Sequence, residues 1–445
     1  MKKSWITILV FLNINSLSAA SLMNVVHDVL QYNTDYLSAR ASSALVKDSL
    51  AIAKSNWMPQ LSVNASKGQT ITRPNPNPQG ADPSKQKLES TAYGLTLNQK
   101  LLDMPSWLSL KKQSYQVQQA IYQEYYTRQS VMYQAAVQYF AVLQALGSYE
   151  NELTKTKSYK EQLRQVKQEY EAGKAAQPTL AQVESQYLLA KAELLSARNN
   201  IIYEVQKLSQ MTGRNYNYVQ TLGSKMPLAV PMPNKVDFWI NLMKKQNVSL
   251  KSKYASLSAA RQAVEAARAS AAPTINFSAG ASRSRPITFA SEDFGKINTW
   301  SLSFNWPIVT GGRAAAVLSQ SLHAQQQAEQ AQIASERDLR QQTISSFYDI
   351  RVGIEQVKAA SQAVHSANIA MMALKDGYLA GTQTISDVLQ SISRLHAARL
   401  QLIKARYGYL GEVLRLKLIT GVLSEKDFIA TSKLLTKKHP VGTYS

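Results

Sequence analysis

The chain contains one structural plan twice, and this duplication constrains its fold more than any other feature of the sequence. Residues Tyr170–Gly213 align without a gap on residues Tyr378–Gly421, with 14 identities in 44 positions. The identical positions include a tyrosine and a glycine at the start of each stretch and a Thr-Gly pair at its end. Turn residues and helix residues therefore repeat together, which indicates an internally repeated structure.

The first twenty residues have the pattern of a secretory signal peptide. Two lysines precede an apolar run over residues 5–12, and the small residues Ser18, Ala19 and Ala20 follow. This order predicts export with cleavage before Ser21. A retained anchor helix is the alternative, but it needs ~20 apolar residues, and polar residues interrupt the run from Asn13 onward.

The composition excludes several kinds of site. The chain has no cysteine, which excludes disulfides, thiolate metal sites and thiol nucleophiles. Its five histidines lack the paired spacing of metal ligands, so we expect neither a metal nor a cofactor. The net charge is +21, yet the basic residues are scattered without an aromatic-interleaved patch, which disfavours nucleic-acid binding. After the leader, no run of ~18 apolar residues predicts a membrane-spanning helix.

Each copy of the plan has the same order of predicted elements. A helical run of 36 residues stops near a proline, Pro59 or Pro273. A strand pair follows, and then a long helix over residues 104–172 or 313–380, which would span on the order of 100 Å. A glycine, Gly173 or Gly381, ends this helix, and a further 36-residue helix stops before a second glycine. We therefore expect a first repeat over residues 21–213, a proline-rich linker over 214–236, a second repeat over 237–421 and a partly flexible tail over 422–445.

The predicted strand pairs, at about residues 60–103 and 274–310, alternate apolar and small polar residues. Their apolar positions form one face that we expect to contact lipid: Leu61, Val63, Leu95, Leu97, Ile275, Phe277, Trp300, Leu302, Phe304 and Trp306. One alternative is a sheet that buries this face on helices in a soluble domain. The helices are too long to fold back over so small a sheet, and four strands close a barrel only with strands from other chains.

With these elements in this order, the chain resembles the TolC family of outer-membrane factors over about residues 21–428. The similarity is carried by the opening SLMNVVHDVLQYNTDYLSARA, by WMPQL and APTI at the strand entries, and by FNWPIVTGGR, GYLAGTQTISDVL and ARYGYL in the second copy. The resemblance implies a mainly α fold with a small β-barrel: a homotrimer with a twelve-stranded outer-membrane β-barrel, four strands per chain, continuous with a periplasmic α-helical barrel. It implies a channel for efflux of small molecules or type I protein secretion, with a periplasmic adaptor protein and an inner-membrane transporter as partners.

The resemblance also assigns roles at the two glycine turns. It makes Asp387, Gln390, Tyr378 and Gln383 the expected pore constriction, and it places adaptor contacts at Ala172, Gly173, Lys174, Ala380, Gly381 and Thr382. From the residues alone, Thr384-x-x-Asp387 is also a capping pattern in which the acid favours the helix dipole. Two residues depart from the family: Gln383 stands where relatives often have arginine, and Gln390 stands where some relatives have a second aspartate.

Two other classes of function are weighed against the channel. A secreted coiled-coil structural or adhesin protein is the alternative, but it requires neither alternating strands nor matched helix lengths. An enzyme is not expected, because no nucleophile, carboxylate pair or metal cluster occurs at a meaningful spacing.

Overall fold

A computed structural model describes residues 21–72, 86–223, 226–285 and 294–441. The expected signal peptide, residues 1–20, lies outside these ranges. The chain divides into two compact units: one contains Met1–Ala39, Tyr125–Val248 and Arg337–Ser445, and the other contains Arg40–Glu124 and Ser249–Glu336. Each unit therefore takes segments from both copies of the repeat.

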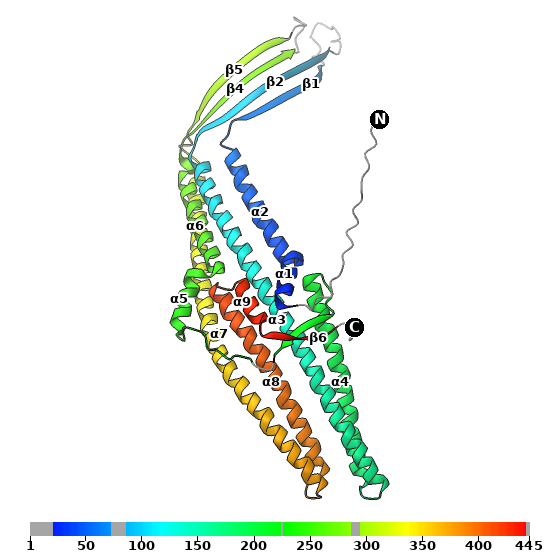
Figure 1. Ribbon diagram of the computed structural model, residues 1–445. Coiled ribbons are helices and arrows are strands. Elements are labelled where there is room, and N and C mark those ends of the chain that lie inside the picture. The colour runs from blue at the N-terminus through cyan, green and yellow to red at the C-terminus, as the bar shows by residue number, and fades with distance from the viewer. Residues whose placement is uncertain (1–20, 73–85, 224–225, 286–293, 442–445) are drawn as a thin grey trace. The chain divides into compact units, whose positions relative to one another are not determined.

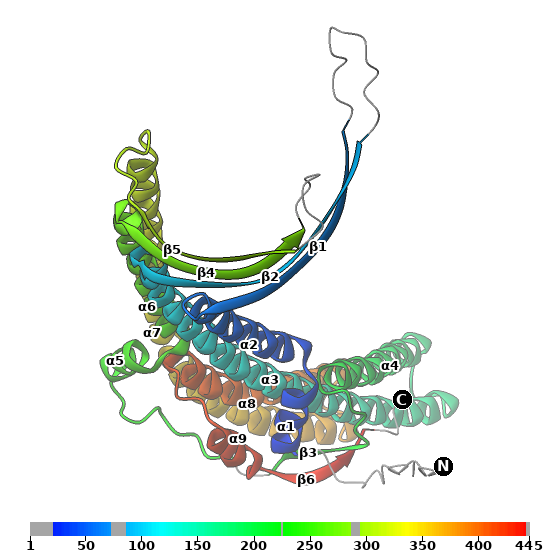
Figure 2. The ribbon, with the colours of Figure 1, turned by 90° about the horizontal axis from the view of Figure 1, so that it is seen from above.

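One four-stranded antiparallel sheet contains both predicted strand pairs (Figures 1 and 2). The first copy supplies β1 (Gln60–Thr72) and β2 (Gln86–Asp103), and the second supplies β4 (Thr274–Arg285) and β5 (Gly295–Asn305). The order is β1-β2-β4-β5, so the pairing of β2 with β4 joins the two copies. The register is regular except for a shift between Lys100 and Leu102. Figure 2 shows the strands curving together as one sheet.

Two helical hairpins follow the strands, one in each copy (Figure 1). The long helices are α3 (Met104–Glu171) and α7 (Arg313–Leu379), and the shorter ones are α4 (Gln177–Thr212) and α8 (Ile385–Thr420). The long helices have 68 and 67 residues and the short ones 36 each, within one residue of the lengths predicted from the sequence. Gly213 and Gly421, both left-handed, end the short helices as expected.

The first helical run of each copy is broken, although the sequence was expected to form one continuous helix there. The runs consist of α1 (Leu22–Tyr32) and α2 (Thr34–Ser55), and of α5 (Val236–Gln246) and α6 (Val248–Arg268) with the short 3-10 helix η1 (Ala269–Ala271). The break is an asparagine in both copies, Asn33 and Asn247, with ψ of 124° and 119°. The Asn33 side chain accepts from the backbone N–H groups of Asp35 and Tyr36, and Asn247 Nδ2 donates to Ile419 O at 2.6 Å. These hydrogen bonds of the asparagine side chains stabilise the non-helical backbone at the two breaks.

The expected linker and tail also contain regular structure. Within the linker, β3 (Tyr218–Leu222) pairs antiparallel with β6 (Leu435–Pro440) of the tail, which also forms α9 (Glu425–Ser432). Val219 and Phe428 are buried in the main core with residues of α1, α3 and α8. Tyr139 joins α3 to this two-stranded sheet. Its hydroxyl donates to Gln220 O at 2.9 Å and accepts from Gln220 N at 2.8 Å. The expectation of a partly flexible tail is therefore wrong for residues 425–441.

Candidate functional site

The strand residues expected to contact lipid lie on one face of the sheet. Directly paired residues of antiparallel strands point to the same side, and the register pairs the members of this face with one another: Leu61 with Leu97, Val63 with Leu95, Phe277 with Leu302, Ile275 with Phe304 and Ala279 with Trp300. The pairing of Leu97 with Ala279 continues the face from β2 to β4.

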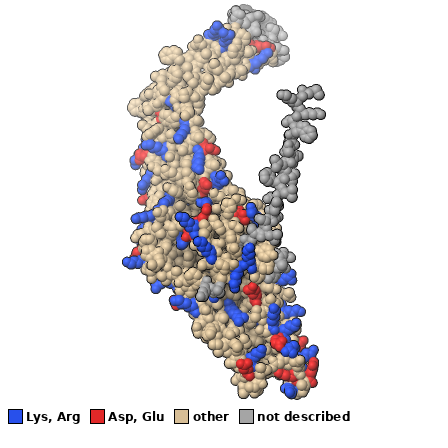
Figure 3. Space-filling model, viewed as in Figure 1, with Lys and Arg blue, Asp and Glu red and all other residues tan. Residues whose placement is uncertain are grey.

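This face is open in the single chain. Val63 is 77 % exposed, Trp300 79 % and Phe304 63 %, values far from those of core residues. Figure 3 shows few charged side chains over the middle of the strands. Trp306 differs from the other expected lipid contacts because it follows the end of β5, where its indole N–H donates to Ala271 O at 3.1 Å.

The opposite face of the sheet carries small polar side chains. The register pairs Ser62 with Thr96, Asn98 with Ser278, and Ser278 with Ser301. The hydroxyls of Ser278 and Ser301 lie 2.7 Å apart and form a hydrogen bond. The sheet is therefore apolar on one face and hydroxyl- and amide-rich on the other, as in strands that separate lipid from an aqueous lumen.

The two glycine turns have the same backbone hydrogen bonds. In the first, Gly173 N donates to Tyr170 O at 2.9 Å and Lys174 N to Glu169 O at 2.7 Å. In the second, Gly381 N donates to Tyr378 O at 3.0 Å and Thr382 N to Gly377 O at 2.9 Å. Both glycines have positive φ, 73° and 76°, which residues with a Cβ rarely adopt. The duplication therefore extends to individual bonds of the tips.

All six residues assigned as adaptor contacts are exposed in these turns. A Cβ built on Gly173 or Gly381 meets no other atom within 4 Å in the described chain. The turns therefore present uncovered backbone at the ends of the helical hairpins (Figure 1).

The expected pore residues occupy two kinds of position. Asp387 lies in the first turn of α8 and forms a capping box: its carboxylate accepts from Thr384 N at 3.1 Å, and Asp387 N donates to Thr384 Oγ1 at 3.3 Å. The hydrogen bond from the Thr384 side chain, more than any other contact, lowers the pKa of Asp387. Gln383 and Gln390 are exposed nearby. Tyr378 instead faces α3, where its hydroxyl donates to Glu169 Oε2 at 2.6 Å.

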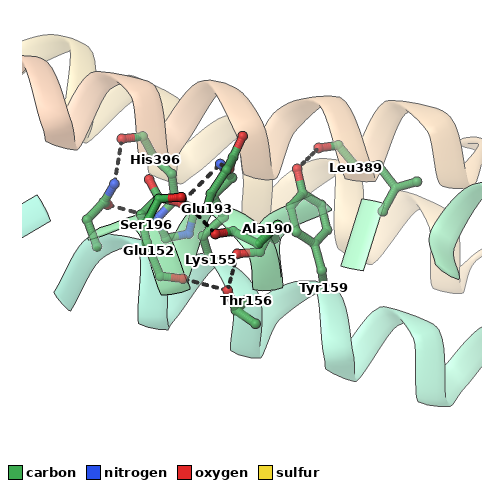
Figure 4. Close-up of polar contacts among 11 residues, drawn as sticks. Glu152, Lys155, Thr156, Tyr159, Ala190, Glu193, Ser196, Leu389 and His396 are labelled. Carbon is green, nitrogen blue, oxygen red and sulfur yellow. Dashed lines mark hydrogen bonds and ion pairs between the residues drawn. The ribbon is translucent and has the colours of Figure 1, made fainter. Parts of the chain in front are cut away.

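A seam of polar contacts that the sequence did not predict joins α3 to α4 and α8 (Figure 4). Lys155 of α3 bonds to Glu152 at 3.1 Å and also contacts Glu193 of α4. Thr156 Oγ1 donates to Ala190 O at 3.1 Å, and Tyr159 Oη donates to Leu389 O of α8 at 3.3 Å. Tyr159, Ala190 and Leu389 also belong to an apolar cluster near the tips, to which α3, α4 and α8 all contribute.

His396 of α8 is buried in the same seam. One of its ring nitrogens lies 2.9 Å from Asn151 Oδ1, and Asn151 Nδ2 donates to His396 O at 3.0 Å. Burial, helped by the charges of Arg399 and Lys155, lowers the pKa of His396 to about 4. At neutral pH this histidine is therefore an uncharged side chain packed between the helices.

Neither a metal cluster nor a membrane helix is found in the described ranges. No group of three or more His, Asp or Glu side chains there could hold a metal ion. Of the helices described, none is long and apolar enough to cross a bilayer.

The model of the outer membrane efflux protein family matches residues 25–214 and 239–422, both copies of the repeat. The chain belongs to this family. TolC of Escherichia coli K12 is 28 % identical over 99 % of this chain and 90 % of its own length. The alkaline protease secretion protein AprF of Pseudomonas aeruginosa is 22 % identical, with 92 % of this chain and 86 % of AprF aligned.

Solved structures of outer-membrane channels share the fold. The CmeC channel of Campylobacter jejuni superposes with a TM-score of 0.78 at 16 % identity, with coverage of 95 % of this chain and 94 % of CmeC. VceC of Vibrio cholerae gives 0.76 at 16 % identity, with coverage of 90 % and 96 %. The predicted fold class, mainly α with the strands of a small β-barrel, is confirmed.

Family membership settles the class of function. The chain is an outer-membrane protein with a large periplasmic helical part, and it provides an exit duct. The family is one of channels rather than enzymes. The alternative of a secreted coiled-coil adhesin or structural protein is not favoured.

Proposed function

We propose that three chains assemble so that their sheets close one twelve-stranded barrel in the outer membrane. The observation that carries this proposal is the continuous apolar face on a sheet whose outer strands, β1 and β5, pair on one side only. A barrel removes such edges by joining β5 of one copy to β1 of the next. The expected lipid contacts then face the membrane, and the polar face lines the lumen.

Exposed apolar residues on the helices support the same assembly. Leu188, Leu189 and Tyr203 of α4 and Ile369 and Met372 of α7 are each more than half exposed in the single chain. Long helices with apolar residues on their outward faces bury them against neighbouring helices. A closed ring of helices from three chains would supply those neighbours and form a helical part of the duct.

The duct is proposed to export small molecules, secreted proteins or both, with energy supplied by an inner-membrane transporter. Similar proteins carry names from both classes: AprF and PrtF are protease secretion proteins, and BepC of Brucella suis is an outer membrane efflux protein. The turns at Gly173 and Gly381 are the proposed contacts of a periplasmic adaptor, because their exposed backbone permits close approach.

Asp387 is proposed to form a ring of three carboxylates at the constriction, with Gln390, Gln383 and Tyr378 around it. Capping does not conflict with this role, because the hydrogen bonds from Thr384 favour the charged carboxylate. Asp387→Asn separates the two roles, since an amide oxygen still accepts from Thr384 while the charge is lost. In single-channel recordings we expect weaker cation preference and weaker block by multivalent cations. Gln390→Asp is expected to strengthen both.

The assembly and the duct have separate tests. Crosslinking of outer-membrane extracts should yield mainly trimers, and a fully active monomer or dimer would refute the barrel. Deletion of the gene, followed by measurement of drug sensitivity and of a secreted protein, identifies the cargo class. Unchanged conductance and block in correctly assembled Asp387→Asn trimers would remove that residue from the pore.

A further inference from the structure

A cavity of about 480 Å³ lies beside the two-stranded sheet, within the unit that contains β3 and β6. Its walls come from α3, α8 and both strands. The sheet itself was not expected from the sequence, and none of the roles proposed above uses this space. The volume falls within the range of small-ligand sites.

Positive charge dominates the polar lining of the cavity. Arg399 and Arg406 project from α8, and Lys437 and Lys438 come from β6, whereas Glu150 is the one carboxylate residue in the lining. Glu150 already has a partner, since its Oε1 lies 2.9 Å from His439 Nε2. The four cationic side chains have no ion-pair or hydrogen-bond partner among the residues that the structure describes.

The two arginines are placed to act together. They are seven residues apart on α8, so they lie on the same side of the helix at a spacing of roughly 10 Å. Both are half-buried, and a guanidinium in a concave, partly dry site attracts anions more strongly than one in open solvent. Its planar fork matches a carboxylate through two parallel hydrogen bonds.

Beneath the charges, the cavity has an apolar floor. Leu143 and Leu146 of α3 are each 1 % exposed, and Leu402 and Ile403 of α8 lie beside them. A free inorganic anion could pair with the arginines but would gain nothing from these side chains. An acidic peptide offers both carboxylates and aliphatic groups. In the polyproline II conformation, which has three residues per turn, residues i and i+3 lie on the same side of the peptide about 9 Å apart.

We propose that this cavity binds a short acidic peptide segment of another periplasmic protein, with one carboxylate at Arg399 and a second at Arg406. The lysines of β6 add attraction at the rim, and the leucines receive an apolar side chain between the two acids. This site is distinct from the turns proposed to contact an adaptor, and its occupancy does not depend on the cargo of the duct.

The test uses the purified full-length protein in its assembled form in detergent. The probe is a fluorescent hexapeptide, Leu-Glu-Ala-Leu-Glu-Ala, whose two glutamates stand three residues apart, and the control peptide has glutamine in their place. Fluorescence anisotropy should show binding of the acidic peptide and not of the neutral one. Arg399→Gln or Arg406→Gln should each weaken binding about tenfold, and added salt should weaken it further.

The duplication supplies matched control variants. Lys191 and Arg198 of α4 occupy the aligned positions of the first copy, are exposed and do not line the cavity. Lys191→Gln and Arg198→Gln remove the same charges and should leave peptide affinity unchanged. Circular dichroism and bilayer conductance should match the unaltered protein in all four variants, which separates this inference from the channel proposal.

Several results would overturn the proposal. Equal weakening by the α4 and α8 substitutions would mean that net charge, not the cavity, attracts the peptide. Displacement of the peptide by inorganic phosphate at equal concentration would identify a site for free anions. Absence of peptide binding, or binding only to anionic vesicles or to soluble cell-wall fragments, would exclude an acidic peptide as the ligand.

Discussion

The Tyr378 hydroxyl joins the two helical hairpins of a chain near their tips. Its removal tests whether this contact holds the tip of the channel closed. Tyr378 Oη of α7 donates to Glu169 Oε2 of α3 at 2.6 Å, and Gln165 Nε2 fixes the other carboxylate oxygen at 3.0 Å. Burial and the hydrogen bond to Glu169 raise the pKa of Tyr378, so the phenol remains a donor across the usable pH range. Tyr378→Phe removes this donor and leaves the ring packed against the apolar cluster of the tips.

The expected effect follows from the charge and exposure of the pair. A hydrogen bond to a charged group contributes about 1.5–3 kcal/mol, and the partial exposure of both residues reduces this to ~1 kcal/mol per chain. Three chains would together lose ~3 kcal/mol, which shifts the ratio of closed to open tips on the order of 100-fold. Glu169→Gln keeps an acceptor and loses only the charge, so we expect a smaller shift.

Single-channel recordings measure this shift as a rise in open probability or conductance of Tyr378→Phe. Tyr170 is the aligned tyrosine of the first copy, and the structure describes no side-chain hydrogen bond for it. Tyr170→Phe is therefore the matched control and should behave like the unaltered channel. An unchanged Tyr378→Phe trimer, or an equal gain in the control, would refute the closing role of the contact.

Three further outcomes are expected. Phe304→Arg should impair insertion by about 2–4 kcal/mol if the site lies near mid-membrane, whereas Ser303→Arg, on the polar face, should insert; equal insertion of both, measured by heat-modifiable migration, would contradict the assigned faces. His396 has a folded pKa of about 4 against 6.5 when unfolded, so the free energy of unfolding should fall from pH 6.5 toward 4 by up to about 3 kcal/mol, and His396→Gln should flatten the denaturation profile. Gly421→Ala should destabilise the protein more than Gly381→Ala, because both have similar φ but only a Cβ at Gly421 would lie 2.5 Å from Gln246 O; equal melting temperatures would contradict this.

The elements that the sequence predicted well are those with local signals. Alternation of apolar and polar residues marked all four strands of the large sheet, and the glycines at the helix ends marked the long and short helices to within a residue. The face of the sheet on which each strand residue lies also followed from this alternation, because side chains in strands have a period of two. Asn33 and Asn247 were local signals too, at the same place in both copies, but helical periodicity on each side concealed the breaks.

The elements that the sequence missed depend on contacts between distant residues. Leu435–Pro440 has two lysines and a terminal proline, which do not indicate a strand, and it becomes one through pairing with Tyr218–Leu222 far earlier in the chain. The partner of Tyr378, Glu169, lies 209 residues away, and that of His396, Asn151, lies 245 residues away. No spacing along the sequence identifies such pairs.

The two tips show how duplication can keep a backbone and change its chemistry. Both turns have the same backbone hydrogen bonds. The N-cap residue of α4, Ala176, makes no side-chain cap and a proline follows in the first turn, whereas α8 starts with the Thr384–Asp387 capping box. Proline lacks the backbone N–H that would need a partner at this helix end, and Thr179 stands in the first copy where α8 has Asp387. In the second tip the carboxylate of Asp387 takes part in capping the corresponding helix end. The hydrogen bonds of this cap also lower the pKa of Asp387 and so favour its ionised form. In a ring built from three chains, the acid-bearing tips would alternate with tips that carry Lys174. A cation-attracting constriction could therefore arise from one copy of the repeat without disturbing the turn geometry that both copies share.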